Sequence, residues 1–212
     1  MALVKVCGIT RIEDAREAHA LGYDAIGLVF AESPRRLSPE QARSISRSLP
    51  AGILRVGVFV NEEAGEVKRL MEYCDLDLVQ LHGEEDPGEV SLFGARAIKA
   101  LRPRCREDLA LMDEYPDVFA ILLDGWNPDR RGGSGTACDL DLAARAAGGR
   151  RVILAGGLNP TNVTEAVART RPFGVDVSSG VESGPGVKDG ALLREFISQA
   201  RKALSAAEQG DN

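Results

Sequence analysis

Several patterns are missing from this chain, and each absence narrows the class of protein. No C-x-x-C pair occurs among the cysteines Cys7, Cys74, Cys105 and Cys138, so neither a zinc site nor a disulfide framework is indicated. No N-terminal apolar signal region and no long uncharged apolar run is present, which argues against secretion and membrane insertion. The formal net charge is -6 and the arginines are scattered, so no basic face for nucleic acid is expected. These absences predict a cytoplasmic protein that holds no metal and binds neither nucleic acid nor membranes.

Length and composition indicate one ordinary folded domain. The chain has 212 residues, which is enough for one sizeable core and too few for two. Hydrophobic residues make up 44% and charged residues 27%, the balance of a globular protein. The residues after Leu204 are small and polar. We therefore expect a single domain over residues 1–204 and a frayed polar tail over residues 205–212.

Short β-branched, apolar runs recur about every two dozen residues, with helical patterns between them. Strands are expected at Leu3–Cys7, Ala25–Phe30, Leu54–Val60, Leu76–His82, Arg96–Leu101, Val118–Asp124, Arg151–Leu154 and Gly174–Val177. Helices are expected to begin at capping residues Thr10, Ser38 and Asn159, and to lie at Glu62–Tyr73, Pro87–Phe93, Arg106–Glu114, Leu140–Ala147, Pro160–Ala168 and Gly190–Leu204. Strict alternation favours an α/β fold of the closed (β/α)8 TIM-barrel type, with an open doubly wound sheet as the alternative.

Two turns near the end of the chain suggest a phosphate site. One strand runs into Ser178-Ser179-Gly180, and the preceding strand runs into Gly156-Gly157. Small residues at the carboxyl ends of barrel strands leave backbone N–H groups accessible to an anion. One phosphate could therefore be held between the two turns. By contrast, Gly132-Gly133-Ser134-Gly135 lacks the lysine and preceding strand of a P-loop and is interpreted as a flexible loop.

Reactive side chains are expected at the same carboxyl ends of the strands. Cys7 closes the first strand; a free cysteine can be a small buried hydrophobe, but a strand end makes it a candidate for catalysis. Asp124 follows an apolar strand, where partial desolvation would raise its pKa and let it donate a proton. A helix cap or a salt bridge is the alternative role for Asp124. Arg35 follows the second strand and could clamp a carboxylate or phosphate, while one of the adjacent pair Arg35 and Arg36 is expected to be a surface charge.

Other polar residues are less clearly marked as parts of a functional site. Gln80 and His82 alternate along one strand and should point to the same side, with His82 lining the pocket or supporting another group. Asp176 could orient other groups from inside the barrel. Glu182 is expected to cap an element or to face solvent, and His19, in a helix, is expected to have no role.

An ordered set of motifs resembles the signature of the phosphoribosylanthranilate isomerase family. The resemblance runs from residue 4 to about residue 188, nearly the whole chain. Its motifs are Lys5-Val6-Cys7-Gly8-Ile9-Thr10, Gly57-Val58-Phe59-Val60-Asn61, Val79-Gln80-Leu81-His82-Gly83, Leu122-Leu123-Asp124, Gly132-Gly133-Ser134-Gly135, Gly156-Gly157-Leu158-Asn159-Pro160-Thr161-Asn162-Val163 and Asp176-Val177-Ser178-Ser179-Gly180-Val181-Glu182.

The resemblance implies an eight-stranded barrel and an Amadori rearrangement in tryptophan biosynthesis that needs neither metal nor cofactor. It implies Cys7 as general base, Asp124 as general acid and Arg35 as ligand of the anthranilate carboxylate. The phosphate would lie at Gly156, Gly157, Ser178, Ser179 and Gly180, with Gln80, His82 and Asp176 also lining the substrate site. The Ser-Pro-Arg pattern favours Arg35 over Arg36.

Two other functions are compatible with these residues. A histidine-pathway isomerase on the same barrel would carry an aspartate in place of Cys7 and a second phosphate site. A non-catalytic phosphate-binding barrel would use Cys7 only as a core residue. The sequence leaves both a monomer and a homodimer open.

Overall fold

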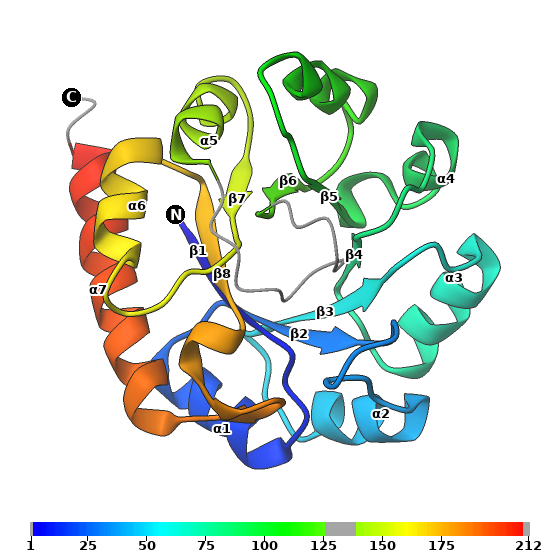
Figure 1. Cartoon of the computed structure of the whole chain (residues 1–212). Coiled ribbons are helices and arrows are strands. Elements are labelled where there is room, and N and C mark those ends of the chain that lie inside the picture. Colours follow the sequence, from blue (N-terminus) through cyan, green and yellow to red (C-terminus); the bar gives the residue numbers. More distant parts are fainter. Residues whose placement is uncertain (1, 126–138, 210–212) are drawn as a thin grey trace.

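Eight parallel strands form a closed barrel, as the alternation of strands and helices predicts (Figure 1). The computed structural model describes residues 2–125 and 139–209. Each strand pairs with the next along the chain, and the last pairs with the first. The open doubly wound sheet is therefore excluded. The loop Gly132–Gly135 and Cys138 lie outside the described residues.

All eight expected strands are present, most of them slightly shorter than expected. They are β1 (Leu3–Cys7), β2 (Ala25–Val29), β3 (Leu54–Phe59), β4 (Leu78–Leu81), β5 (Ala97–Leu101), β6 (Ala120–Leu123), β7 (Val152–Leu154) and β8 (Gly174–Val177). His82 and Asp124 fall just beyond β4 and β6, but their N–H groups still bond to the neighbouring strands, at Phe59 (2.8 Å) and Leu101 (3.0 Å). Their backbones are therefore fixed as if they were strand residues.

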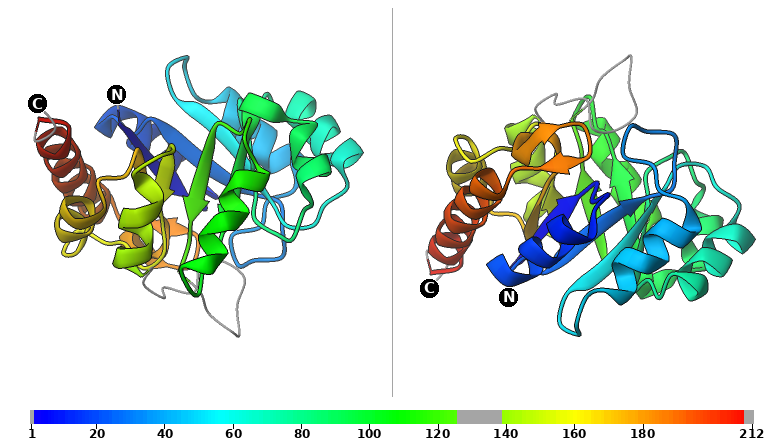
Figure 2. Two further views of the ribbon diagram at one scale, coloured as in Figure 1. Left: turned by 90° about the horizontal axis from the view of Figure 1, so that it is seen from above. Right: turned by 90° about the horizontal axis from the view of Figure 1, so that it is seen from below.

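Helices surround the barrel, as the views in Figure 2 show. The α-helices are α1 (Ile12–Leu21), α2 (Pro39–Arg47), α3 (Ala64–Tyr73), α4 (Pro87–Ser91), α5 (Leu140–Ala147), α6 (Val163–Thr170) and α7 (Gly190–Gln209), and the 3-10 helices are η1 (Gly94–Arg96), η2 (Glu107–Glu114) and η3 (Ser179–Val181). The α-helix expected over Arg106–Glu114 is thus a 3-10 helix. Met112 alone is buried in it, so little packing favours a full α-helical turn.

Helix starts follow the sequence signals only in part. The capping box at Ser38 is confirmed, because its side chain accepts a hydrogen bond from the Gln41 N–H (3.2 Å) and its own N–H donates to the Gln41 side chain (2.9 Å). The prediction of a capping box at Thr10 was wrong. Helix α1 begins one residue later than a cap at Thr10 requires, and the Thr10 hydroxyl donates to the Gly186 carbonyl instead. Asn159 caps a turn that precedes α6 rather than the helix itself, by accepting from the Thr161 N–H.

The C-terminal region departs from expectation in two ways. Helix α7 continues past Leu204 to Gln209, so it extends into the segment expected to fray. Before it, β9 (Glu182–Gly184) and β10 (Val187–Lys188) form an antiparallel hairpin that the sequence did not predict. The hairpin, orange in Figure 2, lies beside the end of β1. No helix in the described ranges is long and apolar enough to cross a membrane.

The barrel interior changes from apolar to polar toward the carboxyl ends of the strands. Side chains alternate along a strand, so Leu3, Lys5 and Cys7 of β1 point to the same side. Leu3 belongs to an apolar cluster of inward residues from seven of the strands. Above it, Lys5 is paired in register with Asp176 of β8, and their side chains form a buried ion pair of 2.8 Å. Polar groups therefore occupy the upper part of the barrel.

Breaking the Lys5–Asp176 pair should destabilise the fold strongly. We expect Lys5→Met to lower the free energy of unfolding by about 3–5 kcal/mol, because it leaves an uncompensated buried carboxylate. The double variant Lys5→Met/Asp176→Leu should recover most of that loss. The control Asp75→Asn, in the exposed pair with Arg47, should change it by less than about 1 kcal/mol. Denaturant unfolding measures all three; a small effect of Lys5→Met alone would contradict this role.

Candidate active site

The predicted site residues meet at one end of the barrel. Cys7 ends β1, His82 follows β4, Asp124 follows β6 and Ser178 follows β8. These are all carboxyl ends of parallel strands, where barrel enzymes carry their chemistry. The Ser178 hydroxyl donates to the Cys7 carbonyl (3.2 Å), so β1 and β8 remain joined above their last ladder residues.

Two glycines leave space at the rim, one for the Cys7 thiol and one for the Arg35 side chain. A Cβ atom on Gly27 of β2 would lie 2.6 Å from the Cys7 sulfur. Gly8 has a positive φ of 76°, and a side chain there would collide with the Arg35 stem. Both side chains therefore depend on a neighbouring glycine for their positions.

Lysines, rather than Arg35, are the main cations acting on the thiol. Burial raises the pKa of Cys7; Lys5 opposes this shift, Asp176 adds to it, and Lys188 opposes it. Neither lysine was predicted from the sequence to act on the thiol. Lys5 could have been found from its two-residue spacing to Cys7 on β1, whereas Lys188 lies in the unpredicted hairpin. In the free protein Cys7 is accordingly held as a thiol at neutral pH.

Gln80, His82 and Asp124 form a hydrogen-bonded chain across the mouth. Gln80 and His82 do point to the same side, with 2.8 Å between the Gln80 amide Nε2 and the His82 Nδ1. His82 Nε2 lies 3.2 Å from Asp124 Oδ2. With the amide as donor, Nδ1 accepts and the Nε2–H of His82 donates to Asp124. The other Asp124 oxygen accepts from the Gly125 N–H (2.9 Å), so the carboxylate is fixed at both oxygens.

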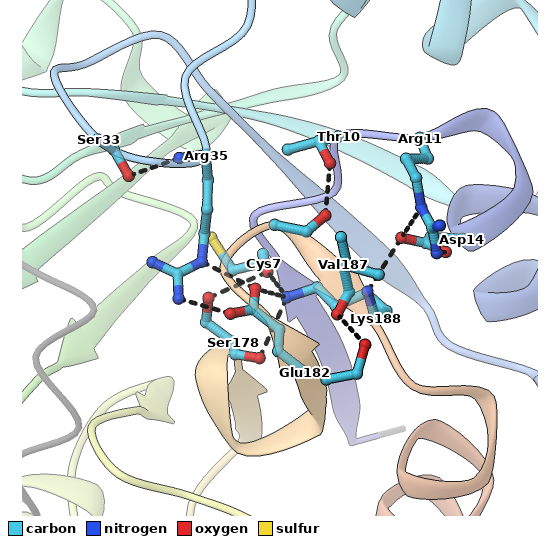
Figure 3. A network of polar contacts seen from close by, with 12 residues as sticks. Cys7, Thr10, Arg11, Asp14, Ser33, Arg35, Ser178, Glu182, Val187 and Lys188 are labelled. Carbon is cyan, nitrogen blue, oxygen red and sulfur yellow. Dashed lines mark hydrogen bonds and ion pairs between the residues drawn. The ribbon is translucent and has the colours of Figure 1, made fainter.

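Arg35 reaches the site, where a carboxylate of the protein itself holds its guanidinium. Its guanidinium forms a two-point contact with Glu182, from Nε to Oε1 (2.8 Å) and from Nη2 to Oε2 (2.6 Å) (Figure 3). The expectation that Glu182 caps an element or faces solvent was wrong, because its side chain is only 5% exposed. It is buried because the hairpin carries it back over β1. Arg36 is exposed on the loop.

The two turns expected to bind phosphate lie against each other. Gly156 and Gly157 adopt positive φ angles of 85° and 66°, which glycine tolerates best. A Cβ atom on Gly180 would collide with the Leu158 carbonyl oxygen, so the β8 turn packs directly on the β7 turn. Within the described part of the chain, the N–H groups of Gly157, Ser179 and Gly180 make no hydrogen bond. These groups remain available to an anion.

Asp176 belongs to the barrel interior rather than to the rim. Its Oδ2 accepts from Lys5, while its Oδ1 is buried and has no hydrogen-bond partner among the residues that the structure describes. His19 lies on α1, away from these residues in sequence and structure. Among the described residues, no group of three or more histidine, cysteine or acidic side chains could hold a metal ion.

Comparison with known proteins identifies the family. The chain matches the family described as "N-(5'phosphoribosyl)anthranilate (PRA) isomerase" over residues 4–199. It is 48% identical to the N-(5'-phosphoribosyl)anthranilate isomerase of Pelobacter propionicus over 206 residues, which cover 97% of this chain and 98% of the relative.

Solved structures agree with this match. The phosphoribosyl anthranilate isomerase of Thermotoga maritima superposes with a TM-score of 0.88 at 43% identity, covering 95% of this chain and 100% of that one. A second isomerase structure, in complex with reduced 1-(o-carboxyphenylamino)-1-deoxyribulose 5-phosphate, has a TM-score of 0.83 at 41% identity and covers 95% and 100% of the two chains. A closed barrel with a thiol and a carboxylate at the rim, together with these matches, shows that the chain belongs to the N-(5'-phosphoribosyl)anthranilate isomerase family.

Proposed function

We propose that the chain converts N-(5'-phosphoribosyl)anthranilate to 1-(2-carboxyphenylamino)-1-deoxy-D-ribulose 5-phosphate, with Cys7 as base and Asp124 as acid. This Amadori rearrangement in tryptophan biosynthesis would need no metal or cofactor, and the enzyme would act in the cytoplasm as a monomer or homodimer. One observation carries the proposal: Cys7 and Asp124 stand at the same rim of the barrel as two glycine turns with free N–H groups. An acid, a base and an anion site are what the reaction requires.

Asp124 is the group that would open the sugar ring. It would give a proton to the ring oxygen while the lone pair of the anilino nitrogen forms the iminium, and the C–O bond to the ring breaks. His82 Nε2, 3.2 Å from Asp124 Oδ2, is suited to hold the carboxylate once its proton has left. Gln80 supports His82 from below through the contact with Nδ1.

Cys7 would then remove the C2' proton of the iminium. The electron pair moves toward the iminium nitrogen and gives an enol, which becomes the ketone when C1' takes up a proton and the C2' hydroxyl loses one. C2' is thus oxidised and C1' reduced, so no external redox partner is needed. The iminium charge favours the thiolate, and Lys5 and Lys188 act in the same direction against the effect of burial.

The substrate's two anionic ends would be bound at separate places. The phosphate would lie between Gly156-Gly157 and Ser178-Ser179-Gly180, held by backbone N–H groups. The anthranilate carboxylate would contact Arg35. The family assignment disfavours a histidine-pathway isomerase.

Variants of the acid and base test the proposed function against a non-catalytic barrel. Cys7→Ser and Asp124→Asn should each lower kcat by about 10²–10⁴-fold, because a hydroxyl is too weak a base and an amide cannot donate the proton. The matched control Cys105→Ser alters an exposed cysteine and should keep kcat. Consumption of phosphoribosylanthranilate by purified protein measures each rate. Inactive wild-type protein that still binds inorganic phosphate would favour the non-catalytic barrel.

The raised pKa of the Cys7 thiol gives a pH-dependent prediction. Only the thiolate reacts with iodoacetamide, and a raised pKa means less thiolate at any given pH. Alkylation of Cys7, followed by mass spectrometry, should therefore be slow at pH 7 and rise with a midpoint above the ordinary value of about 8.5. Inorganic phosphate should change the midpoint little, since it binds away from the sulfur. A midpoint below the ordinary value would contradict burial as the dominant influence.

A further inference from the structure

Glu182 occupies one edge of the Arg35 guanidinium and leaves the other open. The contact uses Nε and Nη2, which form the side edge. Nη1 of Arg35 makes no hydrogen bond within the described part of the chain. A guanidinium has five N–H donors in one plane, so a second carboxylate can bind at the Nη1–Nη2 edge. The Glu182 contact therefore fixes the plane in which that second carboxylate must lie.

Lys188 holds Glu182 in place from the opposite side. Its Nζ donates to Glu182 Oε1 (2.8 Å), and also to the carbonyls of Cys7 (2.6 Å) and Ser178 (3.1 Å). The Lys188 side chain is fully buried. Figure 3 shows this cluster of Arg35, Glu182 and Lys188 between the ends of β1 and β8. The orientation of Arg35 is thus tied to the strand end that carries the thiol and to the turn proposed for phosphate.

Arg35, Glu182 and Lys188 together carry one positive charge: burial lowers the pKa of Lys188, but its Nζ donates three hydrogen bonds, as only an ammonium can. Burial opposes ionisation of Glu182, but hydrogen bonds from Arg35 and Lys188 outweigh it and hold the pKa below its usual range. Glu182 is therefore ionised at neutral pH and cancels one of the two cations. Without Lys188, an Arg35–Glu182 pair would be neutral and would attract an anion weakly. With Lys188, the Arg35 edge keeps the attraction for a carboxylate.

We propose that Glu182, held by Lys188, is a positioning residue that presents the Nη1–Nη2 edge of Arg35 to the aromatic carboxylate of the substrate. This inference rests on the proposed function, because it names the part of that substrate which Arg35 recognises. The preference of the enzyme for an aniline with an ortho carboxylate then depends on the whole cluster of Arg35, Glu182 and Lys188, and not on Arg35 alone. Removing Glu182 frees the guanidinium to rotate, and the carboxylate loses its aligned partner.

A double-variant cycle separates this role from a merely structural one. The variants are Glu182→Gln, Arg35→Ala and both together, and the control is Glu66→Gln, which alters the same two-point contact with Arg69 on the exposed face of α3. Two probes are titrated by calorimetry: the reduced product analogue, which bears the carboxylate, and inorganic phosphate, which does not. KM and kcat for phosphoribosylanthranilate are measured alongside.

Glu182→Gln should weaken binding of the reduced analogue about tenfold, as expected for a lost charge-assisted contact, and raise KM more than it lowers kcat. Binding of inorganic phosphate should stay within about twofold of wild type. In the Arg35→Ala background, Glu182→Gln should have no further effect, because there is no guanidinium left to orient. Glu66→Gln should change neither probe.

Two results would overturn the proposal: an equal loss of phosphate binding in Glu182→Gln, or a full effect of Glu182→Gln in the Arg35→Ala background. Should Glu182→Gln fail to fold, Glu182→Asp supplies the same cycle, since it keeps the charge and shortens the reach to Arg35. Absence of turnover in the wild type would count against the proposed function, whereas the analogue titration still decides the role of Glu182.

Discussion

The buried ion pair between Lys5 and Asp176 is the interaction on which the site depends. It joins the first and last strands of the barrel at positions that are paired in register. The Lys5 Nζ and Asp176 Oδ2 atoms lie 2.8 Å apart, and both side chains are buried. Because side chains alternate, the next inward residues along these strands are Cys7 and Ser178. Any shift of β1 against β8 would therefore displace the thiol from the phosphate turn. The pair fixes the position of β1 relative to β8, although burying its two charges costs free energy.

Above this pair, the rim is organised by hydrogen bonds between distant parts of the chain. On one side, Gln80 and His82 fix Asp124. On the other, the β9–β10 hairpin brings Glu182 and Lys188 over the end of β1. Asp124 and Cys7 thus have different surroundings: Asp124 contacts His82 and lies near Arg102, whereas Cys7 lies near Lys5 and Lys188. Such different surroundings suit the opposite proton-transfer roles proposed for the two side chains.

Much of the fold could be predicted from the sequence because its signals are local. Each strand is a short apolar run, and strict alternation with helices favours the barrel over an open sheet, which the closed strand order then excludes. Reactive side chains are expected at strand ends in such a barrel, and Cys7 and Asp124 do lie at the ends of β1 and β6. The buried role of Glu182 could not be predicted, because its partner Arg35 lies 147 positions away and no local pattern marks the pair. The helix cap at Thr10 was wrongly predicted for a similar reason. Its hydroxyl donates to the carbonyl of Gly186, which is distant in sequence, and not to its own helix.

The most direct test of this account is a crystal structure of the protein with the reduced product analogue bound. The phosphate is expected between the turns at Gly156-Gly157 and Ser178-Ser179-Gly180, and the aromatic carboxylate on the open edge of Arg35. The C2' atom should then face the Cys7 sulfur, with the C4' hydroxyl, the former ring oxygen, toward Asp124. A phosphate bound elsewhere, or an analogue whose C2' atom lies out of reach of Cys7, would contradict it.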